Sequence, residues 1–254
     1  KQGYVARGLS KGLTAEDAEE IRRQFPELFM VYPLTRRGGV GMRMGDFRSD
    51  DVMVQGTNEE WRKREWVYTL SGRFFNSQDV KQAARVCVLL HHGGWIKKPF
   101  WARYFPVKPM TRHLDRRDAV GQQVLLGDHL FTVVGVIKEP PRDRDPRWFH
   151  QSSRSQGTVY VPITAFQRYL QRGKPRLEQI QVDTGDVATT GAYFRRIDSL
   201  LRSRHRGEDD FEIKDFREIM EGAMQQMRKF IISIMIIGIV AILASGIGIM
   251  NVTL

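Results

Sequence analysis

The sequence predicts an α+β fold followed by a helix long enough to cross a bilayer. The first observation is an apolar run over residues 230–254 that contains no Asp, Glu, Lys, Arg or His. Roughly 20 such residues in a helix match the hydrocarbon layer of a membrane. The second observation is that helix and strand patterns occupy both ends of the preceding polar part, with a β-rich block between them. We therefore expect one αβ subdomain built from both ends of this part, with the β-rich block inserted in it.

The first part of the chain begins with a predicted helix over residues 13–23. Thr14 is a natural N-cap there, and Glu16 and Asp17 lie in the first turn, where the helix dipole favours negative charge. The elements expected next are strands over residues 28–35, 40–44 and 51–55, with a turn at Gly38-Gly39, and a short helix over residues 58–67.

The middle and the end of the soluble part alternate between strand and helix patterns. In the middle we expect a capped helical turn over 77–84, strands over 85–90, 120–126, 129–137 and 159–163, a turn at Gly127-Asp128, an exposed loop over 139–156, and a brief helix capped by Thr164 and ending at Leu170. At the end we expect a strand over 178–182, an amphipathic helix over 187–204 and a strand over 211–215.

The chain is basic, with 40 Lys and Arg against 29 Asp and Glu among 254 residues and a formal net charge of +11. Such a charge suits nucleic acid, but the arginines are scattered and mostly interleaved with acidic residues, which favours solvated faces. Attraction to anionic lipid headgroups fits a membrane-tethered domain better than nucleic acid does. The single cysteine, Cys87, excludes an internal disulfide, and its apolar surroundings predict a buried strand residue.

The sequence offers no set of residues typical of catalysis or metal binding. It contains no Gly-x-x-x-x-Gly-Lys-Ser/Thr loop for a nucleotide, no His-Glu-x-x-His and no cysteine pair for zinc. His91 and His92 are adjacent, so on a strand they point to opposite faces and do not share one ion. Asp209-Asp210 is expected in a polar turn, where solvation or capping is the usual role. We therefore assign no catalytic, cofactor-binding or metal-binding residue and predict that this chain is not an enzyme.

The segment before the apolar run keeps helical periodicity without a proline or a turn signal. A single rigid rod would then join the folded domain to the membrane, with Gly222 as its weakest point. The candidate lever residues are Phe216, Ile219, Met220, Ala223, Met224 and Met227. A buried core helix is the alternative, which the length of the apolar run disfavours.

Small residues lie four apart on one face of the predicted span, where they would let another helix approach closely. These candidate packing residues are Ala241, Ala244, Ser245 and Gly248.

Several motifs stand in an order that resembles the MacB-like ABC-transporter permeases. They are Leu13-Thr-Ala-Glu-Asp-Ala-Glu-Glu-Ile21, Gly72-Arg-Phe-Phe75 with Asp79-Val80, Arg85-Val-Cys-Val-Leu89, Asp118-Ala-Val-Gly-Gln122, Phe131-Thr-Val-Val-Gly-Val-Ile137, Tyr160-Val-Pro-Ile163 and Gly246-Ile-Gly-Ile-Met-Asn251. The last motif is the most specific and adds Gly246 and Asn251 to the candidate packing residues. The chain departs from the family pattern between His91 and Asp118, where an aromatic and basic segment is longer than expected. An extra loop or a partner contact would explain this segment, although core packing is the more usual explanation.

The resemblance implies a domain order. A porter-like αβ subdomain would comprise residues 1–56 and 176–227, the second part including the stalk helix, with a β-rich Sabre-like subdomain inserted at 57–175 and the transmembrane helix at 228–254. This helix would be the second of the permease, and the first would precede Lys1. Arg228 and Lys229 next to the span would, by the positive-inside tendency, indicate a cytoplasmic domain, but large domains cross membranes largely regardless of charge.

The resemblance also implies partners. They are a fused or separate cytoplasmic ATPase domain that binds ATP and Mg²⁺, a second permease copy in a dimer and, in some members, a periplasmic adaptor. The protein would lie in the bacterial inner membrane with its soluble domain in the periplasm, where it would transmit ATP-driven motion for export or extraction of a substrate. A membrane-tethered module that binds a ligand or senses a signal is the alternative function.

Overall fold

The computed structural model of the chain describes residues 12–63, 69–100, 102, 107–144, 155–171, 173, 176–186, 189–208, 210–213 and 216–253, with side chains of the last range described from Met224 to Ile242. The chain divides into two compact units, Lys1–Asp210 and Phe211–Leu254. The first unit is the folded domain, and the second contains one long helix.

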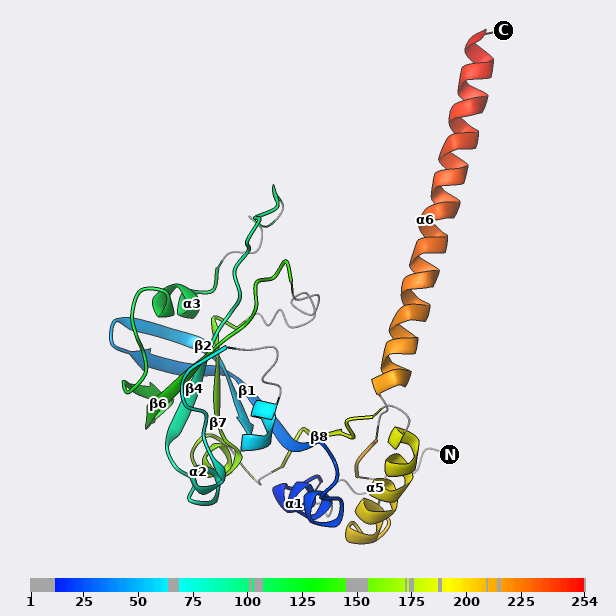
Figure 1. The fold of residues 1–254 in the computed structure, drawn as a ribbon. Helices are drawn as coiled ribbons and strands as arrows, with labels where there is room; N and C mark the ends of the chain where they lie inside the picture. Colours follow the sequence, from blue (N-terminus) through cyan, green and yellow to red (C-terminus); the bar gives the residue numbers. More distant parts are fainter. Residues whose placement is uncertain are drawn as a thin grey trace. The chain divides into compact units, whose positions relative to one another are not determined.

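Six strands of the first unit close into a ring (Figure 1). Around the ring they are β1 (Met30–Met44), β2 (Phe47–Thr57), β7 (Gly157–Pro162), β4 (Val86–His91), β6 (His129–Lys138) and β5 (Gln123–Leu126). The pairs β2–β7 and β4–β6 are parallel, and the others are antiparallel. Because β5 pairs with β1 again, the ring has no free edge, and the α+β fold contains a small mixed barrel.

Alternation of side chains along the strands builds a core on each side of the barrel wall. On β4, Cys87 and Leu89 point into the barrel, whereas Val88 and Leu90 belong to a second cluster outside it. The interior is filled by apolar side chains, among them Met42, Val54, Phe131, Val159, Met110 from α3 (Pro109–Leu114) and Phe166 from the π-helical turn η5 (Phe166–Leu170). The outer cluster includes Trp61, Phe74, Phe75 and Tyr160.

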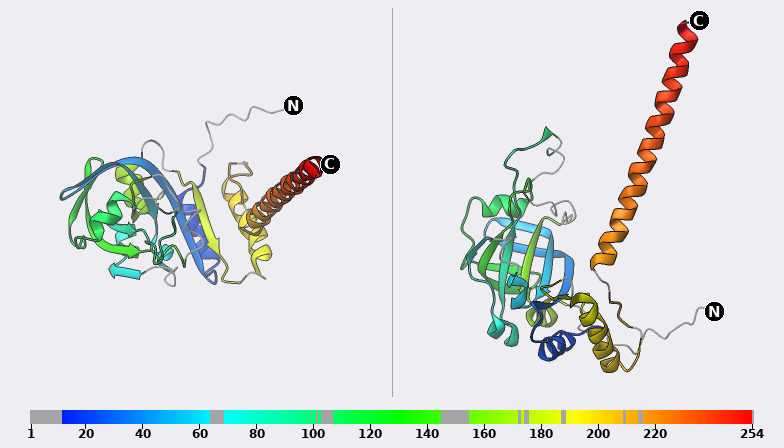
Figure 2. Two further views of the ribbon diagram at one scale, coloured as in Figure 1. Left: turned by 90° about the horizontal axis from the view of Figure 1, so that it is seen from above. Right: turned by 45° about the vertical axis from the view of Figure 1, so that its right-hand side comes forward.

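Two short strands extend the barrel. β3 (Thr69–Gly72) pairs with β6, and β8 (Gln179–Asp183) pairs with the first residues of β1, from Met30 to Leu34 (Figure 2). The helices α1 (Ala15–Gln24) and α5 (Thr190–Arg204) precede β1 and follow β8 in the chain. The register between β1 and β8 therefore brings the two ends of the domain sequence together.

The predicted turn at Gly38-Gly39 is wrong. β1 continues through both glycines, and its register against β2 shifts between Arg37 and Val40, as in a β-bulge. Gly39 has a φ of 65°, which suits glycine and bends the strand without ending it. The turn between β1 and β2 instead lies at Gly45 and Asp46.

Other predicted elements are found with shifted bounds. Thr14 is the N-cap of α1, α2 (Ser77–Lys81) is capped by Asn76, and Gly127-Asp128 joins β5 to β6. The predicted helix over residues 58–67 is a 3₁₀ turn, η1 (Glu59–Lys63), and residues 64–67 lie outside the described part. Of the loop predicted over residues 139–156, residues 145–154 lie outside the described part.

Two further predictions are wrong. Thr164 does not cap the helix before η5: α4 (Ile163–Ala165) begins one residue earlier, with Pro162 as its N-cap, and the Thr164 hydroxyl donates to the Val80 carbonyl oxygen. The predicted strand over residues 211–215 is absent at residues 211–213, and residues 214 and 215 lie outside the described part.

Candidate functional site

A buried carboxylate joins the beginning of α1 to the end of α5. Asp17 is 3% exposed, and its Oδ2 accepts hydrogen bonds from the Thr14 backbone N–H at 2.9 Å and from the Thr14 hydroxyl at 2.8 Å. The other oxygen, Oδ1, accepts from Nε of Arg204 at 2.8 Å. A carboxylate on the first turn of a helix is also favoured by the helix dipole. One side chain thus caps α1 and holds the last residue of α5.

His205 extends this contact to the last residue of the domain. Its Nε2 lies 3.3 Å from Asp17 Oδ2, and its Nδ1 lies 2.8 Å from Asp210 Oδ2. The exposed fractions of the three side chains are 7% for His205, 4% for Asp17 and 9% for Asp210. We call Asp17, Arg204, His205 and Asp210 the corner network. It binds the residue at which the folded unit ends to a helix at the beginning of the domain.

The charges of the corner network change the proton affinity of its members. Burial alone would raise the pKa of Asp17, but hydrogen bonds from Arg204 and Thr14 and the charge of His205 outweigh it and hold this pKa below its ordinary value. Burial alone would lower the pKa of His205, but Asp210 and Asp17 together raise it above its ordinary value. Both shifts favour the charged forms of Asp17 and His205 and therefore favour ion pairing within the network.

A second contact joins the other ends of α1 and α5. Phe25, the C-cap of α1, packs edge-on against Tyr193 of α5, with ring centroids 6.0 Å apart. The guanidinium carbon of Arg196 lies 4.7 Å from the centroid of the Phe25 ring, within the range of a cation–π interaction. The Tyr193 hydroxyl donates to Glu27 Oε1 at 3.0 Å. The two helices are therefore fastened at both ends.

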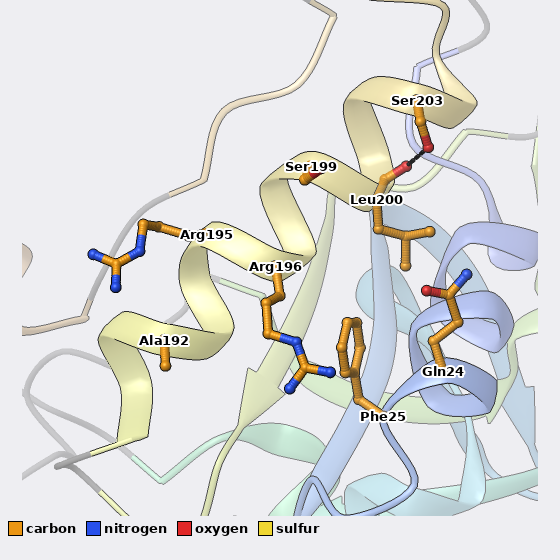
Figure 3. Close-up of a pocket in the computed structure, with 8 residues that line it drawn as sticks. All are labelled: Gln24, Phe25, Ala192, Arg195, Arg196, Ser199, Leu200 and Ser203. Carbon is orange, nitrogen blue, oxygen red and sulfur yellow. Dashed lines mark hydrogen bonds between the residues drawn. The ribbon is translucent and has the colours of Figure 1, made fainter.

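A groove of about 720 Å³ lies between these two contacts. It is lined by Gln24, Phe25, Ala192, Arg195, Arg196, Ser199, Leu200 and Ser203. Figure 3 shows Arg196 reaching over Phe25, and Arg195 pointing away from it. The lining contains no carboxylate, histidine or cysteine, and the groove is open, so it offers neither an acid–base pair nor an enclosed ligand site.

The second unit is the helix α6 (Phe216–Thr253), 38 residues long and unbroken at Gly222 and Gly238. Its stretch Met224–Ile242 is long and apolar enough to cross a membrane, with a mean hydropathy of 1.5. The side chains from Met224 to Ile242 are all exposed. This exposure is expected of a membrane span outside its bilayer and is opposite to that of a buried core helix.

Comparison with known proteins gives the family. A profile of the MacB-like periplasmic core domain matches residues 2–200. This chain belongs to the MacB-like periplasmic core domain family.

Relatives of the MacB-like chain cover nearly all of it. The macrolide export ATP-binding/permease protein MacB of Wolinella succinogenes is 27% identical over 253 residues, which are 98% of this chain and 35% of that protein. The MacB protein of Neisseria meningitidis is likewise 27% identical, over 97% of this chain and 34% of that protein. The chain therefore spans about a third of the length of the curated relatives it matches.

Solved structures share the MacB-like fold. The periplasmic region of MacB from Actinobacillus actinomycetemcomitans aligns with a TM-score of 0.61 at 20% identity, covering 86% of this chain and 85% of that one. The extracellular domain of the ABC-type transporter YknZ from Gram-positive bacteria aligns with a TM-score of 0.56 at 16% identity, covering 81% and 90%. The predicted α+β class and the resemblance to MacB-like permeases are thus confirmed. With α6, they make this chain part of a membrane protein with an extracytoplasmic domain.

The residues predicted for the stalk and for helix packing all lie on α6. Met224, Met227 and Ala241 have exposed side chains. For the other predicted residues only the place in the unbroken helix is described; these are Phe216, Ile219, Met220, Ala223, Ala244, Ser245, Gly246, Gly248 and Asn251. Their roles, and the proposed subdomain boundaries at residues 56, 175 and 227, stay predictions.

Other residues considered from the sequence are buried in the MacB-like domain or have a partner there. Cys87 is fully buried, and burial raises the pKa of its thiol, as in an inert core cysteine. His91 lies 2.7 Å from Asp115 and His92 lies 2.9 Å from Glu139, so the two rings have different partners. Within the described ranges, no three His, Cys, Asp or Glu side chains are grouped as metal ligands would be.

The corner network was not predicted. Asp17 was expected only to interact with the helix dipole, and Asp210 was expected to be solvated, whereas Asp17 is buried and the side chain of Asp210 is only 9% exposed. Asp17 and His205 are 188 residues apart in sequence, so no local pattern pairs them. A partial signal was the acidic first turn of α1 set against the basic last turn of α5.

Proposed function

We propose that this chain is the extracytoplasmic domain and a transmembrane helix of a MacB-like ABC-transporter permease, and that α6 transmits ATP-driven motion between the membrane and the domain. The observation that carries the proposal is the corner network, which fastens Asp210 to α1 and α5. Residues 211–215 are all that separates this attachment from α6.

A lever needs a stiff rod and a firm attachment. A helix of 38 residues is about 57 Å long, and its backbone hydrogen bonds resist bending. At the attachment, a pull on residue 211 acts first on Asp210, which is held through His205 to the buried Asp17. Breaking one partner of a buried ion pair leaves an uncompensated charge and is strongly unfavourable. The load is therefore passed to α1 and the barrel before the end of α5 unravels.

The other parts of the proposed machine lie outside this chain. The relatives are named ATP-binding/permease proteins, and we infer that an ATPase domain, fused to this chain or separate, binds ATP and Mg²⁺ in the cytoplasm. We further infer that two permease copies form a dimer in a bacterial inner membrane, with the domain in the periplasm. There the domain would bind an adaptor, as in some members of the family, and the transporter would export or extract a substrate. The names of the relatives support export.

The test interrupts the helix α6 and leaves the folded domain intact. In the full-length protein in nanodiscs, a spin label at Asp128→Cys, in the exposed turn between β5 and β6, reports the distance between two copies with and without ATP. We expect ATP to shift this distance in the parent protein. Met224→Pro should abolish the shift without abolishing ATP hydrolysis, because proline breaks a helix interior. Met224→Ala is the matched control.

Two outcomes would contradict the lever. One is a parent protein whose distances do not respond to ATP, and the other is a Met224→Pro variant whose distances still respond.

The alternative is a membrane-tethered module that binds a ligand or senses a signal. The groove between α1 and α5 is the feature that favours it, because arginine and apolar side chains meet there. Its openness makes capture of a small molecule weaker than in an enclosed pocket. A ligand-binding module predicts that Met224→Pro leaves ligand-induced changes in the domain unaltered.

A further inference from the structure

Exposed apolar side chains gather on a pair of segments that leave the barrel after β4 and after β6. We call residues 93–100 and 139–144 the arm; Figure 1 shows both segments extending away from the barrel. Ile96 is 57% exposed and Phe100 is 83% exposed, and the exposed Lys97 and Lys98 lie between them. Because the Phe100 ring is exposed beside these lysines, it does not stabilise the core of the domain.

Hydrogen bonds hold the two segments of the arm together at the base. The Arg142 backbone N–H donates to the Gly94 carbonyl oxygen at 2.8 Å, and its Nε donates to the Gly93 carbonyl oxygen at 3.0 Å. Further out, the Lys97 backbone N–H donates to Asp143 Oδ2 at 2.7 Å. A Cβ on Gly93 would lie 1.9 Å from the Pro140 carbonyl oxygen, so the close approach requires glycine. The exposed side chains are therefore presented by a built structure.

The two acidic side chains of the arm, Glu139 and Asp143, already form hydrogen bonds within the domain. Glu139 Oε2 lies 2.9 Å from Nδ1 of His92 and accepts from the Gly93 N–H at 3.3 Å, and Asp143 accepts from Lys97 as above. Between residues 93 and 100 the sequence contains two lysines, Lys97 and Lys98, and no Asp or Glu. The part of the arm from Ile96 to Phe100 is thus positive and apolar, a combination that binds the headgroup region of anionic bilayers.

We propose that the arm docks on the anionic phospholipid surface of the membrane that α6 crosses, with Ile96 and Phe100 entering the interface and Lys97 and Lys98 contacting phosphate groups. The proposal requires that α6 spans a bilayer but not that α6 transmits motion. Tethering keeps the arm at a high effective concentration near lipid, so even weak contacts are populated. The net charge of +11 adds long-range attraction to the same surface.

A fluorophore on the arm measures this contact. In the full-length protein with any accessible native cysteines replaced, Pro99→Cys carries an environment-sensitive dye, and Cys87 can stay because it is fully buried. Nanodiscs contain phosphatidylcholine alone or with phosphatidylglycerol, and doxyl-labelled lipids act as quenchers. We expect a blue shift and quenching in the anionic nanodiscs, weakened by high salt. The same dye at Asp128→Cys, in the turn between β5 and β6, should show neither.

Charge variants separate docking on lipid from other causes. Removing both lysines, as Lys97→Ala with Lys98→Ala, should lower the docked-to-free ratio about 25-fold, at about fivefold for each lysine. Arg43→Ala with Arg48→Ala removes the same charge from the paired strands β1 and β2 and should lower quenching much less, because these arginines lie outside the arm. Quenching that is absent, that is equal in neutral nanodiscs, or that occurs only when another protein is bound would overturn the proposal. A loss of ATP-dependent distance changes would not affect it, so the two proposals fail independently.

Discussion

The barrel and the corner network stabilise the same domain by different physical means. In the barrel, a closed ring of strands surrounds apolar side chains such as Val52, Val124 and Leu126, which are 0% exposed. At the corner, four charged groups hold two helices and the end of the domain. Burial of apolar surface depends little on pH, whereas ion pairs depend on the protonation of each partner. The barrel is therefore suited to be a rigid body, and the corner to be the place where its attachment is adjusted.

The largest expected effect comes from the barrel interior. Phe131 is 1% exposed, packs in the interior cluster and meets Tyr169 edge-on at 6.3 Å. Phe131→Ala should lower the free energy of unfolding of the domain by about 4 kcal/mol, through lost burial and a residual cavity. Chemical denaturation measures it. The neighbouring Leu130 is 51% exposed, so Leu130→Ala should change stability by less than about 0.5 kcal/mol. Equal losses in the two variants would show that the interior is not the core of the domain.

A smaller and more local effect is expected at the corner. Asp17→Ala removes the common partner of Arg204, His205 and Thr14 and should cost about 3 kcal/mol, because several hydrogen bonds to one buried carboxylate are lost together. Unlike the barrel variant, it should increase hydrogen exchange first at residues 201–210. Exposed Glu16, next to it on α1, supplies the control Glu16→Ala. Uniform faster exchange in the barrel and the corner would mean that the corner is not a separate unit of stability.

The difference between local contacts and contacts far apart in sequence explains which features could be predicted from the sequence. The N-cap at Thr14, the strand around Cys87 and the hairpin at Gly127-Asp128 follow from local signals, and they are found. Gly38-Gly39 was misread because glycine permits both a turn and a bulge, and the pairing of β1 with β2 decides between them. Closure of the ring rests on two short pairings, between Met42 and Leu126 and between Arg43 and Leu125, which the sequence does not specify.

Charged groups far apart in sequence were the hardest to predict. Asp17 and Asp210 each stand in a polar stretch, where solvation is the usual state. The low exposure of both side chains depends on how the packing of α1 against α5 excludes water, which is a tertiary property. The exposed aromatic and basic segment after β4 was recognised from the sequence as unusual, whereas its attachment to residues 139–144 was not.

The smallest effect expected is a pH dependence confined to the corner. The pKa of His205 is raised above its ordinary 6.5, so the folded state binds its proton more tightly than the unfolded state does. Its contribution is complete below pH 6.5 and is lost as the pH rises through the raised pKa. The pKa of Asp17 is lowered from 3.8, so its contribution is present above pH 3.8 and is lost as the pH falls through the lowered value.

Hydrogen exchange, corrected for its intrinsic pH dependence, should detect this change at residues 201–210. Protection there should fall as the pH is raised from 6.5, while protection in β6 stays constant. His205→Gln keeps a polar group but cannot be protonated, and it should remove the pH dependence in this range. Asp210 and Asp17 face the imidazole, and Arg204 shares Asp17 with it, so loss of the imidazolium charge weakens the contacts of His205 with both carboxylates. We therefore expect the segment around His205 to loosen as the imidazole loses its charge, and pH-independent protection at residues 201–210 in the parent protein would contradict the proposed role of His205.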